Sequence, residues 1–334
     1  MGLKLTDLID RKDLKWEQLQ GKKIAVDASN VLFQFISSIR QADGTPLMDN
    51  SGNVTSHLVG LFARVPNMMQ KGITPIFVFD GKAPELKENV RIIRRASKEK
   101  AREKFTKAAI EEDEEALSKY SKQMTLLTSK MVEESKELLE ALGLPVVQAP
   151  SEAEAQCAYM TKKRKVWATA SQDYDTLLFG SPRLIQNLTL SQKRKITGGK
   201  MIYISPYLIE LNDVLENLEL NQDELIILAI LMGTDYNPKG VKGIGPKKAL
   251  KLVQSGKKFE QIFEELETDF DWKELFKIIK EIPVIDVELE FKDIDEEKVK
   301  DILVNRHDFS EERVNSTLKK LEKKEDTSLK KWFK

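Results

Sequence analysis

Two pairs of carboxylates, each with a single residue between its members, are the clearest chemical feature of the sequence. Asp173 and Asp175 come directly after the apolar run 166–170, and Glu152 and Glu154 stand at the start of a predicted helix. Two unit charges about 4 Å apart repel by about 4 kcal/mol at an effective dielectric of about 20. Carboxylates crowded in this way need a cation between them, so the spacing predicts a metal site.

Three further aspartates are expected to join them. Asp27 and Asp80 each end an apolar run that predicts a β-strand, and Asp235 follows an apolar helix over 223–232. The carboxyl ends of parallel strands share one edge of a sheet, which is where open α/β sheets place their ligands. We therefore expect all seven carboxylates at one edge of a single sheet.

The types of the candidate ligands indicate which ions would bind. All are carboxylate oxygens, without a cluster of histidine or cysteine, and such ligands suit magnesium or manganese better than zinc. Two such ions about 4 Å apart can hold the attacking and leaving oxygens of a phosphodiester displacement. Taken singly, each acid could instead be a turn or cap residue, and Ser151 with Glu154 has the spacing of a capping box.

The elements that must position these residues predict an α/β fold. Helix-favouring segments alternate with β-rich runs, so the central sheet should be mostly parallel and flanked by helices. The expected strands and extended segments are 23–27, 73–79, 144–147, 166–170, 184–185, 201–204 and 284–291.

A long charged segment interrupts this alternation. Residues 85–130 favour helix but carry few apolar positions, which predicts a helical excursion over the sheet. Between Lys82 and Lys107, ten basic residues stand against four acidic ones, a net charge of +6 in a chain whose formal charge is zero. Such a window is either a solvated helix face or a phosphate-binding surface.

A glycine-rich turn follows Asp235. Gly240, Gly243 and Gly245 precede Lys247 and Lys248, but the Lys-Ser/Thr pair of a P-loop is missing and the turn follows a helix. We expect backbone N–H groups here to approach the phosphates of a duplex without reading its bases. The alternative is a purely structural helix-turn-helix.

The chain ends with large apolar side chains. Leu329 stands three positions before Trp332, which is followed by Phe333. This pattern predicts a peptide that docks in an apolar groove of a partner, and the alternative is a tail folded on its own domain. His57 is expected to be a packing or cap residue, and Cys157 a packing residue.

Composition narrows the class of protein. The chain of 334 residues is 41% hydrophobic and 32% charged, which fits a soluble globular protein. No apolar run approaches the ~20 residues needed to span a bilayer, and a single cysteine excludes an intramolecular disulfide. We expect an intracellular, cytoplasmic protein without a membrane partner.

Six motifs together resemble those of the flap endonucleases, in the structure-specific 5′-nuclease superfamily, and the resemblance runs along the whole chain. They are VDAS (26–29), FVFDGK (77–82), APSEAEA (149–155), ASQDYD (170–175), MGTDY (232–236) and GIGPK (243–247). The resemblance implies a PIN-like α/β core, a helical arch and a helix-hairpin-helix-type element that binds duplex with a potassium ion.

The resemblance also implies a role for each matching residue. Lys87 and Arg94 in the arch would stabilise charge on the scissile phosphate. Two magnesium ions, for which manganese can substitute, would be held in two groups: Asp27, Asp80, Glu152 and Glu154 for one, and Asp173, Asp175 and Asp235 for the other.

DNA contacts are implied along the chain. Gly2 would lie near the junction once Met1 is removed, and Phe33 would stack on a base where relatives often carry tyrosine. Arg40 and Arg64 are further expected contacts, and the glycine turn from Gly240 to Lys248 would bind the duplex.

The implied function is cleavage at the base of 5′ flaps, with 5′–3′ exonuclease activity at nicks and gaps, in Okazaki fragment maturation and repair. The tail resembles the motif that binds a PCNA-type sliding clamp, with Asp326 where a glutamine normally stands. The ending after Phe333 resembles the archaeal form. We expect a monomer associated with the nucleoid of a prokaryote.

Four parts are expected: 1–84 and 131–326 form the nuclease core, 85–130 the arch, and 327–334 the clamp-binding tail, with the duplex-binding element at about 223–256. A junction-binding module without activity, a PIN-type ribonuclease and a related nuclease for bubbles or four-way junctions are the alternatives. The carboxylates argue against the first, the turn and tail against the second, and the short segment between Glu85 and Glu152 against the third.

Overall fold

The structure is a computed structural model of the chain. It describes residues 5–82 except 7 and 42, and residues 84, 86–87, 126–190, 193–195 and 201–332. For 193–195, 201–203 and 323–332 it describes the backbone alone.

The predicted α/β fold with a mostly parallel sheet is confirmed. Five adjacent strands are parallel, and two strands at one edge run antiparallel to their neighbours. In spatial order, the seven strands that the described residues form in this sheet are β1 (Lys12–Asp13), β9 (Tyr207–Glu210), β6 (Arg183–Gln186), β5 (Ala168–Ala170), β2 (Lys23–Asp27), β3 (Thr74–Phe79) and β4 (Val146–Gln148).

Alternating side chains place a hydrophobic core on each face of the sheet. On one face, Val26 and Phe77 pack with the apolar sides of α1 (Ala28–Ser38), α2 (Ser56–Gln70) and α5 (Ser129–Ala141).

On the other face, small residues let a helix approach closely. Ala25 packs against Ala153 and Cys157 of α6 (Ala153–Lys162). Cys157 is fully buried, which confirms that it is a packing residue.

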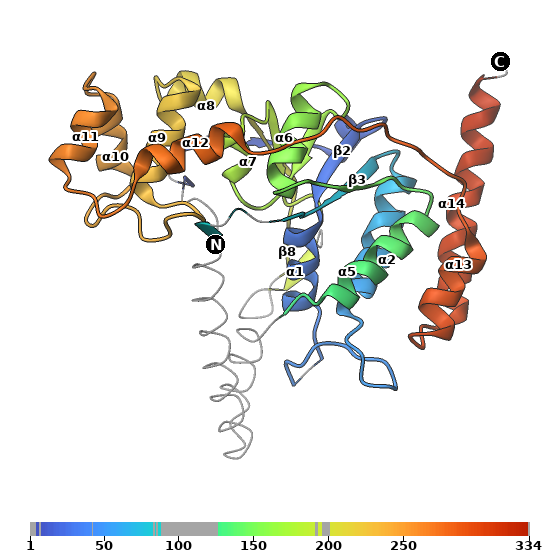
Figure 1. The fold of residues 1–334 in the computed structure, drawn as a ribbon. Helices are drawn as coiled ribbons and strands as arrows, with labels where there is room; N and C mark the ends of the chain where they lie inside the picture. The colour runs from blue at the N-terminus through green and yellow to red at the C-terminus, as the bar shows by residue number, and fades with distance from the viewer. Residues whose placement is uncertain are drawn as a thin grey trace, which may run out of the picture.

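A second group of helices lies beyond the antiparallel side of the sheet, at the left of Figure 1. Its centre is α9 (Gln222–Met232), whose residues from Leu225 to Leu231 are all buried. The helices that pack around the same core are α7 (Asp175–Leu178), α8 (Leu211–Asn217), α10 (Pro246–Val253), α11 (Phe259–Glu265) and α12 (Trp272–Glu281).

Residues 282–295 form a strap that is neither helix nor strand. Figure 1 shows this segment running from α12 across the molecule toward α13 (Glu296–Lys300). Gln156 on α6 holds it, because the buried carboxamide donates to the Ile285 carbonyl at 2.8 Å and accepts from the Ile285 N–H at 2.9 Å. The extended segment expected over 284–291 lies within this strap and forms no strand.

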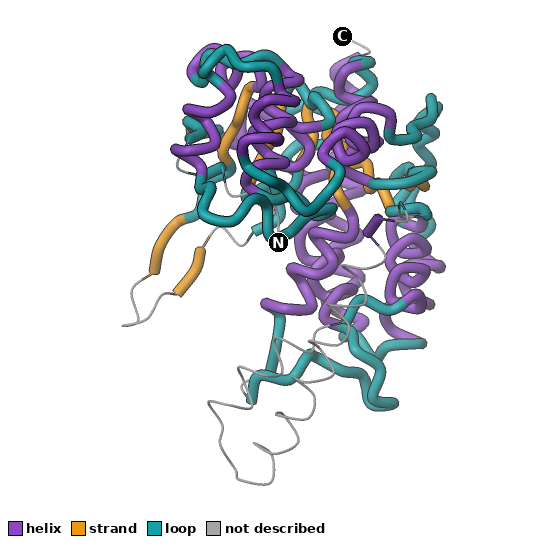
Figure 2. The backbone as a smooth tube through the Cα atoms, turned by 60° about the vertical axis from the view of Figure 1, so that its left-hand side comes forward, coloured by secondary structure: helices purple, strands orange, loops and turns teal. Residues whose placement is uncertain are grey.

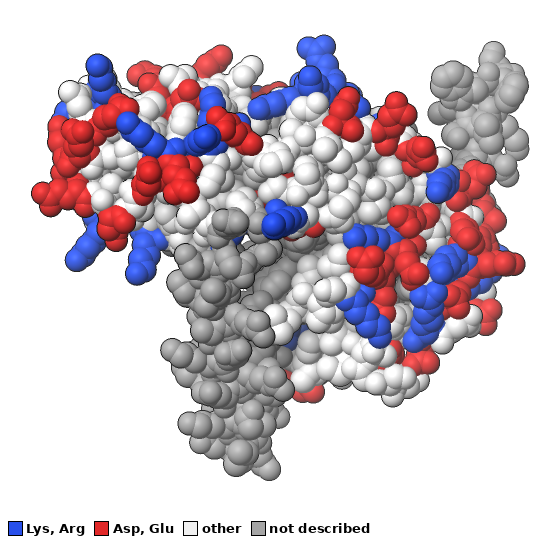
Figure 3. All heavy atoms as spheres, viewed as in Figure 1, with Lys and Arg blue, Asp and Glu red and all other residues white. Residues whose placement is uncertain are grey.

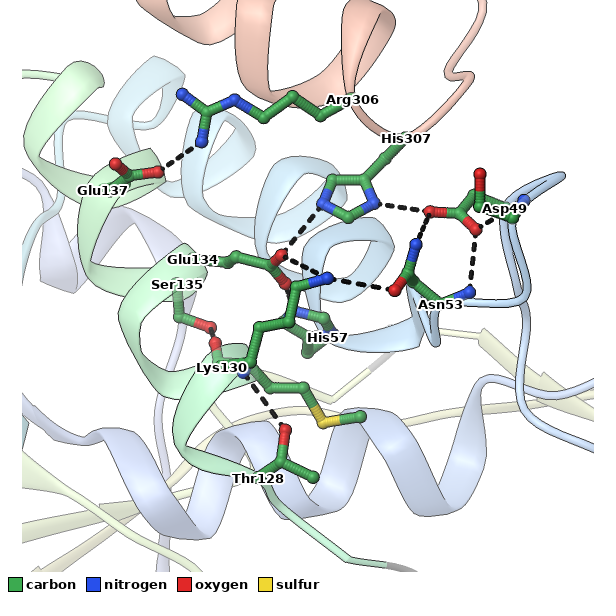
Figure 4. Close-up of polar contacts among 12 residues, drawn as sticks. Asp49, Asn53, His57, Thr128, Lys130, Glu134, Ser135, Glu137, Arg306 and His307 are labelled. Atoms are coloured by element: carbon green, nitrogen blue, oxygen red, sulfur yellow. Dashed lines mark hydrogen bonds and ion pairs between the residues drawn. The ribbon is translucent and has the colours of Figure 1, made fainter.

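The chain then returns to the first group of helices. After α13 it forms the π-helix η2 (Asp301–Asn305) and the long helix α14 (Glu311–Trp332). A polar cluster joins this region to the loop before α2 and to α5, and its members point toward one another in Figure 4. Both of the protein's histidines belong to it, since His307 contacts Asp49 and Glu134, and His57 contacts Glu134.

A small ribbon of two strands projects from the body, as Figure 2 shows. It pairs β7 (Lys193–Lys195) with β8 (Met201–Tyr203). None of the helices in the described part of the chain is both long and apolar enough to cross a membrane. In Figure 3, acidic and basic side chains are mixed at both ends of the visible face, over α10–α12 and over α13–α14.

Candidate active site

The strand ends bring the predicted carboxylates to one edge of the sheet. Asp27 is the last residue of β2 and pairs with Val78 on β3. Asp80 comes directly after the last residue of β3. Asp173 and Asp175 follow β5, which lies on the other side of β2. The parallel register thus carries carboxylates from three adjacent strands to the same edge, as the sequence predicts.

Asp80 also fixes the helix that supplies the next two acids. Its Oδ1 accepts a hydrogen bond of 2.8 Å from the N–H of Ala153, the first residue of α6. The capping box between Ser151 and Glu154 is wrong, because Glu152 is the N-cap residue and its side chain makes no capping hydrogen bond.

The backbone leading into α6 passes close to Gly81. A Cβ at this position would lie 2.1 Å from the Ala149 carbonyl oxygen, so only glycine fits here without a backbone shift. Glu152 and Glu154 consequently start α6 beside the end of β3.

Crowding and burial shift the titration of these acids. Burial raises the pKa of Asp27 to about 8, and repulsion from Asp80 and Asp173 adds to the shift. Burial likewise raises the pKa of Glu154 well above its usual value, and the Asp175 and Asp27 carboxylates raise it further. The direction of both shifts means that the cluster favours a bound proton or another cation.

Lys87 enters the cluster from the base of the predicted arch. Its ammonium forms an ion pair with Glu152, lies 3.7 Å from Asp235 and sits 4.9 Å from the centre of the Tyr236 ring. Burial lowers the pKa of Lys87, but Glu152 and Glu154 raise it by more, so the net shift is upward. Lys87 is therefore held as a cation among the acids.

The donor set fits hard divalent ions, while the side chains are not arranged as a ready ligand set. In the described residues, no three Asp, Glu, His or Cys side chains form a group that could hold an ion as they stand. The fit rests on chemistry: the candidate ligands are oxygen atoms, and burial with mutual repulsion disfavours their charge. A divalent cation would relieve that repulsion, as Lys87 does in part.

The loop that carries Asp235 is braced by a neighbouring amide. Asn237 Oδ1 accepts from the Thr234 N–H at 3.0 Å and from the Thr234 hydroxyl at 2.7 Å, and its Nδ2 donates to the Ile230 carbonyl. Asp235 is thereby placed between the end of α9 and the glycine turn.

The glycine turn leads into α10 as predicted. Gly240 has φ +55°, and a Cβ there would lie 2.6 Å from the Met232 carbonyl oxygen, so this position requires glycine. Gly243 and Gly245 have open space around them, and Gly245 is the N-cap of α10. Lys247 and Lys248 are exposed on the first turn of that helix.

The other expected DNA contacts lie on the first group of helices. Phe33 on α1 is 42% exposed, which is unusual for its size and leaves its ring accessible for stacking. Arg40 donates to the Ser37 and Gly44 carbonyls. Arg64 donates to the Thr189 carbonyl and lies over the Phe35 ring. DNA binding by these three residues stays a prediction.

Several expected site residues lie outside the described part of the chain. These are Gly2, Arg94 and Phe333 in full, most of the arch over 85–130, and the side chains of Leu329 and Trp332. The backbone of α14 continues through 326 to Trp332, across the expected start of the tail.

Sequence reasoning missed residues that hold the acids in place. Asn30 donates from Nδ2 to Asp173 at 2.9 Å, and Gln148 donates to the Asp80 carbonyl at 2.6 Å. Tyr236 is buried beside Glu152, and burial with that carboxylate raises the pKa of its hydroxyl. For Asn30, the sequence offers one indication of a role at the site, because the residue stands three positions after Asp27 at the end of a predicted strand.

Comparison with known proteins places the chain in a family. The model described as the XPG N-terminal domain matches residues 1–101, and the model described as the XPG I-region matches residues 143–235. A protein named Flap endonuclease 1 from Pyrococcus furiosus is 48% identical over 341 residues, covering 100% of both chains. The chain belongs to the flap endonuclease family. The resemblance seen in its motifs is thus confirmed.

Solved structures agree with membership of the flap endonuclease family. The flap endonuclease-1 of Methanococcus jannaschii has a TM-score of 0.77 and 44% identity, covering 96% of this chain and 98% of that one. The catalytic core of Rad2, solved in complex with its DNA substrate, has a TM-score of 0.71 at 23% identity, covering 96% and 100%. At that identity the likeness to Rad2 concerns the fold alone.

Proposed function

We propose that this protein is a magnesium-dependent, structure-specific endonuclease that cuts DNA at the base of 5′ flaps in replication and repair. One observation carries the proposal: carboxylates from three adjacent strand ends and from α6 meet around Lys87, next to the loop that enters the glycine turn. Membership of the flap endonuclease family supports the same activity. The 5′–3′ exonuclease activity at nicks and gaps would use the same site.

The family resemblance assigns the carboxylates to two groups, one for each ion. Two magnesium ions, when bound, would supply the charge that favours in-line displacement at a phosphodiester. Asp27, Asp80, Glu152 and Glu154 lie around the ends of β2 and β3 and would hold one ion. Asp173, Asp175 and Asp235 lie toward α7 and α9 and would hold the other.

The protein's cations would act on the phosphate itself. Lys87 is already inside the cluster and within 3.7 Å of Asp235, so its ammonium can reach a phosphate bound at the same edge. Together with Arg94, it would stabilise charge that develops on the scissile group.

The glycine turn would hold the duplex. Exposed Lys247 and Lys248 and the N-terminus of α10 offer positive charge and N–H groups to the phosphate backbone. A potassium ion at this turn is part of the proposal, as is stacking of a base on Phe33. Because Asp235 precedes the turn by only a few residues, holding the duplex and cutting the strand would be linked along the chain.

A panel of branched substrates tests the activity. Matched 5′-flap, 3′-flap, bubble and four-way DNA are incubated with magnesium or with EDTA, and the cut is mapped on a sequencing gel. We expect one incision at the base of the 5′ flap, dependent on magnesium. Preferred cutting of bubbles or four-way junctions would instead assign the chain to a related nuclease.

A substitution in the cluster tests the assignment of the ligands. Loss of an outer-shell partner of a metal costs about 10- to 100-fold in affinity or activity, so Asp175→Ala should cost at least about 100-fold in kcat. Asp223→Ala is the control, because Asp223 is a partly exposed acid on α9 that pairs with Lys280. Wild-type cleavage by the Asp175 variant would contradict the assignment.

We infer that the C-terminal tail binds a PCNA-type sliding clamp through Leu329, Trp332 and Phe333. The motive is the aliphatic and aromatic spacing in the sequence. Deleting 327–334 should abolish binding to the clamp, measured by surface plasmon resonance, and spare cleavage without it. Lys320→Ala, on the same helix, is the control, and clamp affinity that survives the deletion would rule out this role.

A further inference from the structure

A single carboxamide connects the ends of two neighbouring strands at the active site. Asn30 lies on the first turn of α1, after β2, and its side chain reaches the segment that follows β5. Its Nδ2 donates to Asp173 Oδ2 at 2.9 Å, and its Oδ1 accepts from the Gln172 N–H at 3.3 Å. The two segments that it joins are 143 positions apart in the sequence.

The two hydrogen bonds fix the orientation of the amide. Reversing it would set the carbonyl oxygen against the Asp173 carboxylate and the NH₂ group against the Gln172 N–H. Both contacts would then be repulsive, because the first would join two acceptors and the second two donors. The Asn30 side chain therefore holds Asp173 in one orientation, in which Asp173 Oδ2 accepts the hydrogen bond from Asn30 Nδ2.

The surroundings of Asn30 are fixed on both sides. Its own N–H donates to Asp27 Oδ1 at 3.1 Å, which ties it to the last residue of β2. The Gln172 carbonyl accepts a hydrogen bond of 2.9 Å from Nε2 of Gln186, whose side chain is buried. Gln172 is thus held through both of its main-chain groups, its N–H by Asn30 and its carbonyl by Gln186.

We propose that Asn30 is a positioning residue for the reaction, setting the distance and orientation of Asp173 relative to Asp27. The inference rests on the proposed function, because these two acids are assigned there to different ions. A partner of this kind is worth about 10- to 100-fold in metal affinity or activity. Asn30 would thus act on both groups of ligands through one side chain.

A neutral donor suits this place better than a charged one. A lysine here would compete with a divalent ion for the Asp173 carboxylate, whereas an amide donates one hydrogen bond and leaves the charge of the acid unchanged. The hydrogen bond engages Oδ2 only, so the carboxylate keeps acceptor capacity for a cation. Lys87, in contrast, cancels charge at Glu152.

Two variants separate the hydrogen bonds from the packing. Asn30→Leu has similar volume but makes neither hydrogen bond, and Asn30→Ala loses the volume as well. We expect both to bind Mn²⁺ about 10- to 100-fold more weakly in the absence of DNA, measured by electron paramagnetic resonance of free Mn²⁺. On flap DNA, kcat should fall at low magnesium and recover at high magnesium, while KM for DNA changes by less than about twofold.

Asn217→Ala is the matched control, since Asn217 also donates to an aspartate, Asp10, but on the exposed end of α8. It should match the wild type in both measurements. Unchanged Mn²⁺ affinity in both Asn30 variants would overturn the proposal, as would a loss confined to Asn30→Ala, which would indicate packing alone. A raised KM with unchanged kcat would assign Asn30 to DNA contact instead. The Mn²⁺ titration needs no substrate, so it stands even if the wild type fails to cut 5′ flaps.

Discussion

At the scale of single residues, Lys87 has the most unusual position. Within the described part of the chain it is a half-buried lysine surrounded by acids, and burial of a lone ammonium is costly. Its ion pair with Glu152 offsets that cost and lowers the repulsion within the cluster. The same cation must also repel any divalent ion that approaches the same oxygens.

Lys87→Met should therefore change two measurements in opposite directions. Removing the ammonium takes away a repulsive charge, so Mn²⁺ should bind more tightly without DNA. Cleavage of flap DNA should still slow by about 10²- to 10³-fold in kcat, because charge on the phosphate loses a stabilising partner. Isothermal titration and single-turnover kinetics measure the two effects.

Lys298→Met is the control for this pair of measurements. Lys298 is a lysine on α13 that pairs with Glu137, away from the sheet edge. It should leave both quantities unchanged. If Lys87→Met weakened metal binding, the ammonium would be supporting the ligand geometry and not competing with the ions.

At the scale of elements, the sequence predicts the strands whose ends carry the acids. It does not predict the hydrogen bonds that orient the side chains of those acids. Asp27 and Asp80 each end an apolar run, and parallel pairing then requires that they meet. Asn30 and Gln148 act across large sequence separations on a carboxylate and on a main-chain carbonyl. Single amides of this kind leave no periodic pattern, so the sequence predicts the fold and the place of the acids but not the orientation of their side chains.

The polar cluster of Figure 4 joins the loop before α2, α2 itself, α5 and the turn after η2 through titratable groups. His307 lies 2.8 Å from Asp49 and 3.2 Å from Glu134, and His57 lies 3.3 Å from the other oxygen of Glu134. Burial lowers the pKa of His57 despite that contact, and His307 and Lys130 lower it further. Burial raises the pKa of Asp49, but hydrogen bonds from Asn53 and His307 outweigh it and bring it to about 2.

Acid should therefore remove the stability that His57 and Asp49 contribute in two steps, while the raised pKa values of Asp27 and Glu154 act in the opposite direction. The unfolded chain takes up a proton on His57 below its ordinary pKa of about 6.5, before the folded chain does, and on Asp49 below about 4. Stability contributed by these groups is present at neutral pH and is lost as pH falls through each range. Urea unfolding at pH 7.5, 6 and 5 measures the first step.

His57→Leu removes the first titration. The change in the free energy of unfolding from pH 7.5 to pH 5 should then be more favourable to the folded state than in the wild type, because the loss through His57 is absent. Hydrogen exchange at Asn50 and Asn53, whose N–H groups donate to Asp308 and Asp49, reports local opening of the loop. A pH slope identical to that of the wild type would mean that the pKa of His57 is the same in the folded and the unfolded chain.

At the scale of the whole molecule, the strap 282–295 connects the second group of helices with the C-terminal helix. It passes α6, where Gln156 binds Ile285 through both of its main-chain groups. Lys165 adds an ion pair with Asp286 and a hydrogen bond of 2.6 Å to the Val287 carbonyl. The helix that starts with Glu152 and Glu154 is thus fastened to the segment leaving α12.

Gln156→Ala should loosen the strap. Loss of two hydrogen bonds from a fully buried side chain should cost about 1 to 3 kcal/mol in the free energy of unfolding. Exchange at the Ile285 amide should rise, since its acceptor is removed. Hydrogen exchange read by mass spectrometry checks both the site and the extent of the change.

Gln254→Ala is a suitable comparison for the strap variant. Gln254 also donates to a main-chain carbonyl, that of Leu218, but within the second group of helices. It should leave exchange over 282–295 unchanged. Equal exchange at Ile285 in the wild type and in Gln156→Ala would show that apolar packing of the strap holds it without the amide.

The strap also determines how the molecule would bear a mechanical load. Because Gln156 and Lys165 bind main-chain groups of Ile285 and Val287 along this segment, a force on the second group of helices would load these contacts together, in shear. Tension from a tightly held duplex would therefore reach α6 along the strap as well as through the glycine turn. A force that bound DNA exerts on the second group of helices would then act on α6, whose N-terminus carries Glu152 and Glu154.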